Sequence, residues 1–474
     1  MMSDGLAAFL AKSQSAILLY FLATNLLYLA LFTVSILAIL RHIHSMSYRN
    51  LLEISKSRLA PPISILVPAY NEATGIISSV KALLELNYPT FEVIIINDGS
   101  HDETLQKLIE AFGLSKTKRV YHQTIATKTV KGIYVARSAA AWSRLVLLDK
   151  ENGGKSDALN AGINVSQYPL FCSVDADSIL DRDSLLRVAL PFMERADVVG
   201  VGGMVRIANG CSIAQGLIQI VRLPKQWLPC FQAVEYLRAF LSGRIAWANL
   251  GSLLVLSGAF SLFKKAPVLE VKGYDRSTVG EDMELVMRLH QTLRNQKRAC
   301  GIEFIPDPVC WTEAPERFKM LWRQRDRWQR GLGQSLFRHR ALLFNPRFGV
   351  LGLLTVPYFW AVEFLSPVVE IWGYLIFLIA AVLGQLQWES CAAFFLLAVM
   401  MGVNLSLLAV VLEELTLHRY PQVRDLMRLL AGAIFENFGY RQFTALARFA
   451  GILGFLNRSN VWGVLERKGL GNTA

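Results

Sequence analysis

The chain has 474 residues, of which 53% are hydrophobic and only 18% are charged. Lys and Arg number 49 against 37 Asp and Glu, so the formal net charge is +12 at neutral pH. This composition excludes a disordered chain, a fibrous repeat and a small disulfide-stabilised domain. An apolar and basic chain is typical of a membrane protein with a positively charged inner face. Nucleic acid is not expected as a partner, because chains that bind it are polar as well as basic.

The first apolar run covers residues 16–40 and contains 25 residues without a charge. It is longer than the apolar region of a secretory signal, which is about 7–15 residues, and it can cross a bilayer core of ~30 Å. Cations follow it at Arg41, Arg49, Lys56 and Arg58. By the positive-inside rule they place the next segment in the cytoplasm. Residues 1–59 are therefore predicted to be a transmembrane helix and a cytoplasmic linker.

Residues 60–315 are predicted to form a catalytic α/β domain. Buried strands are expected at 63–68, 91–96, 144–148 and 170–174. Strands that alternate with helices indicate a doubly wound sheet, and such sheets bind ligands beyond the carboxyl ends of their strands. Asp98, Asp175 and Asp177 all follow strands. We therefore expect them to converge on one crevice.

Two acidic motifs and one glycine loop contain candidate binding or catalytic residues. The segment 150–157 (KENGGKSD) is expected to open a helix, where free backbone N–H groups and Lys155 would suit a diphosphate. Asp175 and Asp177 form a DxD pair, which can share a hard cation with that diphosphate. Glu281 and Asp282 are expected at the start of another helix, where a simple N-terminal capping role is the alternative.

Residues 316–348 are basic and amphipathic, and they contain the sequence QRDRW. Between Glu316 and Arg340 there are eight Lys or Arg residues and two acids, interleaved with aromatic and aliphatic side chains. A helix lying on the membrane surface is one interpretation. Gln324, Arg327 and Trp328 also share one helical face, which favours a binding function.

The C-terminal part, residues 349–447, is predicted to cross the membrane four times, giving five crossings in all. Residues 349–388 contain only two charges, Glu363 and Glu370, and as one helix they would be about 60 Å long. We expect a tight turn at Ser366 and Pro367 to divide them into two crossings. The other two are expected at 390–412 and, more weakly, at 426–446. A basic cytoplasmic tail is expected at 448–474.

The ordered set of motifs resembles the inverting, membrane-bound, processive glycosyltransferases of family 2. Cellulose, hyaluronan, chitin and poly-N-acetylglucosamine synthases share the pattern D, DxD, (T)ED, QxxRW. Here these are Asp98 in NDGS, the DAD sequence, GED and QRDRW, and the resemblance covers about residues 60–340. One departure is Gly280, where the family has Thr. The resemblance implies a GT-A fold, that is, a doubly wound mixed sheet inserted between transmembrane helices.

The resemblance also implies roles for individual residues. Asp282, with Glu281 beside it, is implied as the catalytic base, and Asp177 as the ligand of Mg²⁺ or Mn²⁺. The implied acceptor-binding residues are Trp328 and Gly258. The implied donor-binding residues are Pro68, Tyr70, Glu72, Asp98, Lys155, Asp175, Gln324 and Arg327.

The expected function is processive transfer from a nucleotide sugar, UDP-glucose or UDP-N-acetylglucosamine, to a growing β-linked polysaccharide that crosses the membrane. The expected partners are this donor, the polysaccharide acceptor, the lipid bilayer and export subunits. The expected location is the bacterial inner membrane, with several crossings and a cytoplasmic catalytic domain. A lipid glycosyltransferase of the ceramide glucosyltransferase type is the alternative. A receptor built on an inactive transferase domain is a third hypothesis, opposed by the intact acidic motifs.

Overall fold

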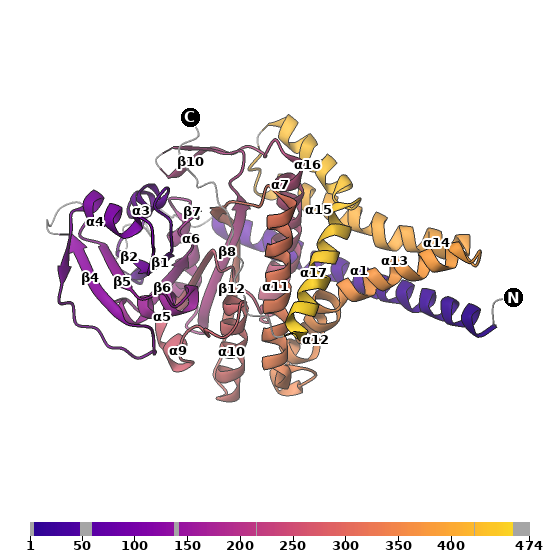
Figure 1. Cartoon of the computed structure of the whole chain (residues 1–474), viewed down its shortest axis with the longest axis horizontal. Coiled ribbons are helices and arrows are strands. Elements are labelled where there is room, and N and C mark those ends of the chain that lie inside the picture. The colour runs from indigo at the N-terminus through magenta and orange to yellow at the C-terminus, as the bar shows by residue number, and fades with distance from the viewer. Residues whose placement is uncertain (1–3, 48–58, 137–141, 215, 421, 458–474) are drawn as a thin grey trace. The chain divides into compact units, whose positions relative to one another are not determined.

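The computed structural model describes residues 4–47, 59–136, 142–214, 216–420 and 422–457. The chain divides into two compact units that interleave along the sequence. One unit, called here the sheet unit, takes its described residues from 43–224 and 250–314. The other, the helical unit, takes them from 1–42, 225–249 and 315–463. Figure 1 labels the elements of both.

A ten-stranded sheet forms the sheet unit, in the order β3-β4-β5-β2-β1-β6-β11-β8-β12-β7. Its strands in chain order are β1 (Ile63–Ala69), β2 (Phe91–Asp98), β3 (Leu114–Thr117), β4 (Val130–Ala136), β5 (Leu145–Lys150), β6 (Leu170–Val174), β7 (Ile179–Leu180), β8 (Val198–Ile207), β11 (Phe260–Lys264) and β12 (Gly301–Thr312). A separate hairpin pairs β9 (Ser212–Ala214) with β10 (Leu217–Ile220). The four strands expected from the apolar runs correspond to β1, β2, β5 and β6.

Pairing within the sheet is mixed. Strands β5, β2, β1 and β6 run parallel, so their carboxyl ends meet at one edge. Strand β11 is antiparallel to both β6 and β8, and β4 is antiparallel to β5. The apolar side chains of β1, β2 and β6 are buried almost throughout, as expected of strands covered on both faces. The expected doubly wound mixed sheet is confirmed.

Helices connect the strands of the sheet unit. They are α3 (Ile76–Leu84), α4 (Thr104–Phe112), α5 (Lys155–Val165), α6 (Ser184–Glu194), α9 (Lys265–Glu270) and α10 (Glu281–Asn295). Two of them begin where the sequence motifs predict, α5 after the Gly-Gly pair and α10 at the acidic pair. Helix α5 lies against β1 and β2, and all its residues after Lys155 are buried. Its first turn therefore stands at the carboxyl edge of the parallel strands.

The helical unit consists of long apolar helices and shorter amphipathic ones. They are α1 (Asp4–Ser47), α7 (Trp227–Arg238), α8 (Ile245–Asn249), α11 (Phe318–Arg338), α12 (Val356–Tyr358), α13 (Ser366–Val382), α14 (Trp388–Phe395), α15 (Met401–Thr416), α16 (Val423–Phe435) and α17 (Tyr440–Leu456). Wider π-helical turns join several of them, at Ala239–Arg244, Leu351–Thr355, Phe359–Phe364 and Leu396–Met400. Helices α11 and α17 lie side by side (Figure 1).

Among the described residues, two helical stretches are long and apolar enough to cross a membrane: Ala8–Ser45 and Trp388–Thr416. A bent pair, Leu351–Phe364 with Ser366–Val382, makes a third if it counts as one span. These criteria identify fewer spans than the five crossings expected from the sequence, which stay a prediction. The length and composition of these helices fit a membrane protein.

Two features explain the lower number. The break at Ser366 and Pro367 lies where it was expected, but the axis bends there by only 44°, so the chain does not turn back. Proline in a helix removes one hydrogen bond and kinks the axis, which is less than a reversal. The crossing expected at 426–446 is instead two helices, α16 and α17, of 13 and 17 residues, with Gly439 between them at a φ of +91°.

Candidate functional site

The loops after β1 and β2 are bonded to each other. Asn71, with a φ of +56°, donates its N–H to Ser100 Oγ at 3.0 Å, and its Oδ1 accepts from the N–H of His101 at 2.9 Å. The N–H of Glu72 donates to Thr104 Oγ1 at 2.9 Å. These bonds leave the ring of Tyr70 exposed, edge-on to the ring of His101 at 6.2 Å. An exposed aromatic side chain therefore stands at this edge of the sheet.

Asp98, at the end of β2, is held by protein groups on both carboxylate oxygens. Oδ1 accepts from the N–H of Gly153 at 3.0 Å and lies 2.6 Å from Lys150 Nζ. Oδ2 accepts from the N–H of Gly154 at 2.8 Å. The two N–H groups expected to face a diphosphate thus bind the protein's own anion. Asp98 fixes the glycine loop, and the loop sets where helix α5 begins.

Lys155, the first residue of α5, lies close to acidic side chains at the carboxyl edge of the sheet. Its Nζ lies 2.5 Å from Asp175 Oδ1 and 3.9 Å from Glu281 Oε1, and it donates to the carbonyl of Gly258 at 3.1 Å. Burial alone would lower the pKa of Lys155, but the charges of Asp175, Glu281 and Asp282 outweigh it and the pKa is raised. The side chain is therefore a permanent cation at this position.

The carboxylate of Asp282 is oriented by two backbone groups. Oδ2 accepts from the N–H of Gly258 at 3.1 Å, and Oδ1 accepts from the N–H of Met283 at 2.8 Å. Together these two hydrogen bonds fix the direction in which the carboxylate points. Gly280 occupies the N-cap position of α10 and makes no side-chain capping bond, so the capping alternative does not account for this acidic residue. The bond to Gly258 ties the carboxylate of Asp282 to the loop before β11.

The DxD pair lies in the turn after β6, where the N–H of Ser178 bonds back to the carbonyl of Asp175 at 3.0 Å. Across the described ranges, no three His, Cys, Asp or Glu side chains form a group that could hold a metal ion. Mg²⁺ is usually held by one or two protein carboxylates, with water and substrate phosphates completing the shell. Asp175 and Asp177 therefore fit a hard divalent ion that arrives together with a diphosphate.

The QRDRW residues belong to the helical unit. Trp328 keeps 43% of its surface exposed, and the guanidinium of Arg325 lies over its ring at 4.3 Å. Arg325 is buried and pairs with Glu235 of α7 at 2.6 Å. The ring of Tyr236, also on α7, is 6.5 Å from that of Trp328. A cation beneath an exposed indole ring makes a flat platform of the size of a sugar ring.

The structure thus brings together Lys155, Asp175, Gly258, Glu281 and Asp282 in the sheet unit. Gln324, Arg327 and Trp328 lie on α11, with Gln324 buried and accepting from Arg325 at 3.0 Å.

A buried role was not predicted for four polar residues of this region: Lys150, Asp157, Asn160 and Asn164. The last three are spaced i, i+3 and i+7 along a helix, and this buried polar face is the signal that could have revealed them.

Residues 61–331 match the family model described as "Glycosyltransferase like family 2". Poly-β-1,6-N-acetyl-D-glucosamine synthase of Staphylococcus epidermidis is 28% identical over 290 residues, which are 61% of this chain and 59% of that protein. The enzyme of the same description from Staphylococcus aureus is 30% identical over 279 residues, 58% of this chain and 56% of that protein. The match thus spans less than two thirds of these relatives.

A solved structure of similar fold is a mannosyltransferase of Pyrobaculum calidifontis in complex with GDP-mannose and Mn²⁺. It superposes with a TM-score of 0.49 at 16% identity, covering 94% of this chain and 99% of that one.

Proposed function

Because the chain belongs to glycosyltransferase-like family 2, we propose that it transfers a sugar from a UDP-sugar to the end of a growing β-linked polysaccharide. UDP-N-acetylglucosamine is the proposed donor, since the matched Staphylococcus proteins are described as poly-β-1,6-N-acetyl-D-glucosamine synthases. The observation that carries the proposal is the meeting of Lys155, Asp175 and Asp282 around Gly258 at the carboxyl edge of the sheet.

Asp282 acts as the general base in this proposal. An inverting transfer needs one in-line attack by an acceptor hydroxyl on the anomeric carbon, and one carboxylate to take the hydroxyl proton. A positioned base contributes roughly 10²–10⁴-fold to such a step. The N–H groups of Gly258 and Met283 hold the carboxylate of Asp282 in one orientation. Glu281 stands beside it as the second acidic residue near Lys155.

Lys155 stabilises the departing diphosphate. The negative charge on the leaving group grows as the bond to the sugar breaks, and a preplaced cation in a partly dry site lowers the energy of that state. Asp177 with Asp175 would hold Mg²⁺ or Mn²⁺, which neutralises diphosphate charge when bound. Lys155 then passes from the carboxylate of Asp175 toward the diphosphate oxygens.

The remaining residues divide between donor and acceptor. Tyr70, beside Pro68 and Glu72, offers a ring face to the nucleotide base, and Asp98 acts through the glycine loop that it holds. Gln324 and Arg327 are proposed to contact the diphosphate, and Trp328, with Gly258, the acceptor sugar. Because the indole ring of Trp328 binds by stacking, a polymer end can slide on it between additions.

The proposed location is the bacterial inner membrane, crossed more than once, with the sheet unit in the cytoplasm. The polymer would leave through the helical unit, with export subunits as partners. The helices long enough to cross a membrane support this placement.

The test uses the full chain in lipid nanodiscs with UDP-[¹⁴C]N-acetylglucosamine and Mg²⁺ or Mn²⁺. We expect UDP release and a radiolabelled product of high mass that a β-1,6-specific hexosaminidase digests. Asp282→Asn should abolish transfer and keep UDP binding, whereas Asp197→Asn, which alters an ion-paired acid in the same unit, should behave as wild type. An active Asp282→Asn protein would refute the assignment of the base.

One observation favours the alternative, a transferase that adds a single sugar to a lipid. The part of the chain that the structure describes has two helices suited to crossing, or three with the bent pair, which is fewer than the five crossings expected from the sequence for a polymer exporter of this kind. Product sizing separates the two: a ladder or long polymer supports the synthase, and one glycolipid supports the alternative.

A further inference from the structure

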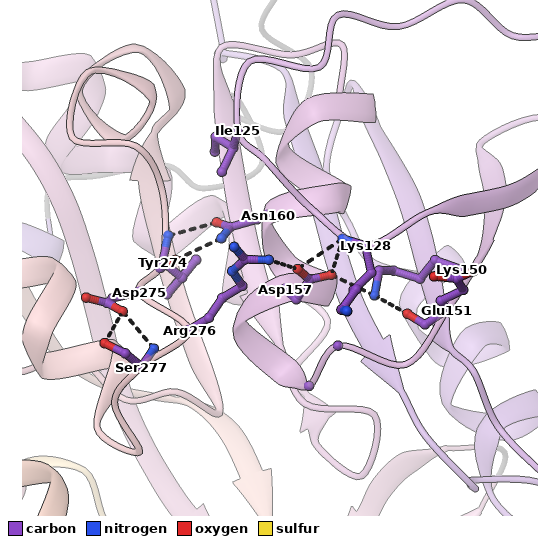
Figure 2. Close-up of polar contacts among 12 residues, drawn as sticks. Ile125, Lys128, Lys150, Glu151, Asp157, Asn160, Tyr274, Asp275, Arg276 and Ser277 are labelled. Carbon is purple, nitrogen blue, oxygen red and sulfur yellow. Dashed lines mark hydrogen bonds and ion pairs between the residues drawn. The ribbon is translucent and has the colours of Figure 1, made fainter. Parts of the chain in front are cut away.

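The polar face of α5 joins three segments of the sheet unit. Asn164 Oδ1 accepts from the N–H groups of Thr124 and Ile125 at 3.1 and 3.0 Å. Asn160 accepts from the N–H of Tyr274 at 2.7 Å and donates to its carbonyl at 2.8 Å. The loop before β4 and the loop before α10 are thus anchored to the same helix, and Figure 2 shows the bonds between Asn160 and Tyr274.

Asp157 is the centre of this face, with no exposed surface. Oδ1 lies 2.8 Å from Lys150 Nζ, and Oδ2 lies 2.9 Å from the Nη1 of Arg276. Both oxygens also accept from the N–H of Lys128, at 3.1 and 3.2 Å. Figure 2 shows Lys128, Lys150 and Arg276 reaching this one carboxylate from three directions.

The charges of this group balance. Lys150, which is fully buried, lies between Asp98 and Asp157, and Arg276 completes a set of two cations and two anions. Buried charges are tolerated when they are paired and hydrogen-bonded. Removal of the guanidinium would leave Asp98 and Asp157 with one buried cation.

Arg276 is the most exposed member of the set: about half of its side chain is exposed (48%), whereas Asp157 is fully buried. It stands in the loop that leads from α9 to α10, five residues before Glu281. The same loop is also bonded to the middle of α10. Arg288 of α10 donates to the carbonyl of Gly273 in the loop at 2.6 Å, and it pairs with Glu284 of its own helix. The position of this loop therefore fixes the start of α10.

We propose that the Arg276–Asp157 ion pair is a latch that positions the catalytic start of α10 against the start of α5. With the latch closed, Asp282 on α10 and Lys155 on α5 both reach Gly258. Arg276 is a positioning residue in this scheme, because it acts on Asp282 through the loop. The inference rests on the proposed function only for its kinetic readout.

The experiment compares Arg276→Gln, Arg276→Lys and wild type as full chains in nanodiscs. The matched control is Arg298→Gln, which removes a half-exposed arginine paired with Glu270 in the same unit. We expect Arg276→Gln to lower kcat about tenfold with an unchanged KM for the donor, since small misplacements of a catalytic group cost rate. Arg276→Lys should recover part of kcat, and Arg298→Gln should match wild type.

Hydrogen–deuterium exchange is the second readout and needs no turnover. In Arg276→Gln, exchange should accelerate in peptides that contain Tyr274 and Lys128, whose N–H groups bond to the α5 face. Unchanged exchange together with wild-type kcat would overturn the latch, as would a lowered melting temperature with unchanged kcat. A KM increase equal to the loss in kcat would instead make Arg276 a donor contact and also overturn it. If wild type makes no polymer, the proposed function fails while the exchange result still decides the latch.

Discussion

His290 is a buried histidine of α10 whose neutral form the fold requires. Its ring has no exposed surface, and its Nε2 lies 3.0 Å from the carbonyl of Leu253, so this nitrogen carries the proton of the neutral ring. Burial, and then the charge of Arg294, lower the pKa from 6.5 to about 3. The histidine therefore links the stability of the sheet unit to pH.

The sign and size follow from proton linkage. Between about pH 6.5 and pH 3 the unfolded chain binds a proton at residue 290 that the folded chain does not, so stability is full above pH 6.5 and falls as pH falls. The slope is about 1.4 kcal/mol per pH unit. From pH 7.5 to pH 5 His290 should cost about 2 kcal/mol of unfolding free energy, or roughly 3–6 °C in melting temperature.

The assay is thermal unfolding of the full chain in detergent, followed by tryptophan fluorescence at several pH values between 5 and 7.5. His290→Gln keeps a donor for the carbonyl of Leu253 and cannot titrate, so its melting temperature should fall less with acid than that of wild type. His122→Gln, which replaces an exposed histidine, should keep the wild-type dependence. Equal acid dependence of wild type and His290→Gln would refute the reasoning.

Three further predictions concern the site. Lys155→Met should lower the rate of UDP release by about 100-fold, because it removes the cation that faces the leaving group, while the exposed Lys297→Met should have no effect. Gly273→Ala should destabilise the chain by roughly 2 kcal/mol in thermal unfolding, since φ is +71° and the new Cβ would lie 2.3 Å from Asn160 Oδ1. Chelation by EDTA should stop turnover without lowering the melting temperature, and Mn²⁺ or Mg²⁺ should restore it.

The parallel core of the sheet could be predicted because each of its strands is a short apolar run closed by a turn signal. The expected strand at 170–174 has the bounds of β6, and the expected starts at 63 and 91 are those of β1 and β2. The antiparallel neighbours β4 and β11 were not predicted. Their direction depends on tertiary pairing, and β4 is a half-exposed strand without a continuous apolar run.

The acidic and glycine motifs could be recognised one by one in the sequence, but the bonds between them could not be predicted. Asp157 and Arg276 are 119 positions apart, and neither belongs to a motif that defines the family pattern. The bend at Pro367 shows a different limit. A proline in an apolar run predicts an interruption, while the size of the bend depends on what the two helices pack against.

The buried ion set changes how a substitution at Asp98 must be interpreted. A loss of donor binding after Asp98→Asn is the result expected if Asp98 touches the nucleotide. The same substitution, however, removes one of the two carboxylates that pair with Lys150 among the described residues. It also weakens the hydrogen bonds that Asp98 accepts from the glycine loop. Lys155 begins the helix that follows this loop, so its ammonium would move as well. Because Arg276 completes the same set, the proposed donor side and the proposed base share one electrostatic support. The four charged residues are therefore expected to act as a unit whose single substitutions do not add.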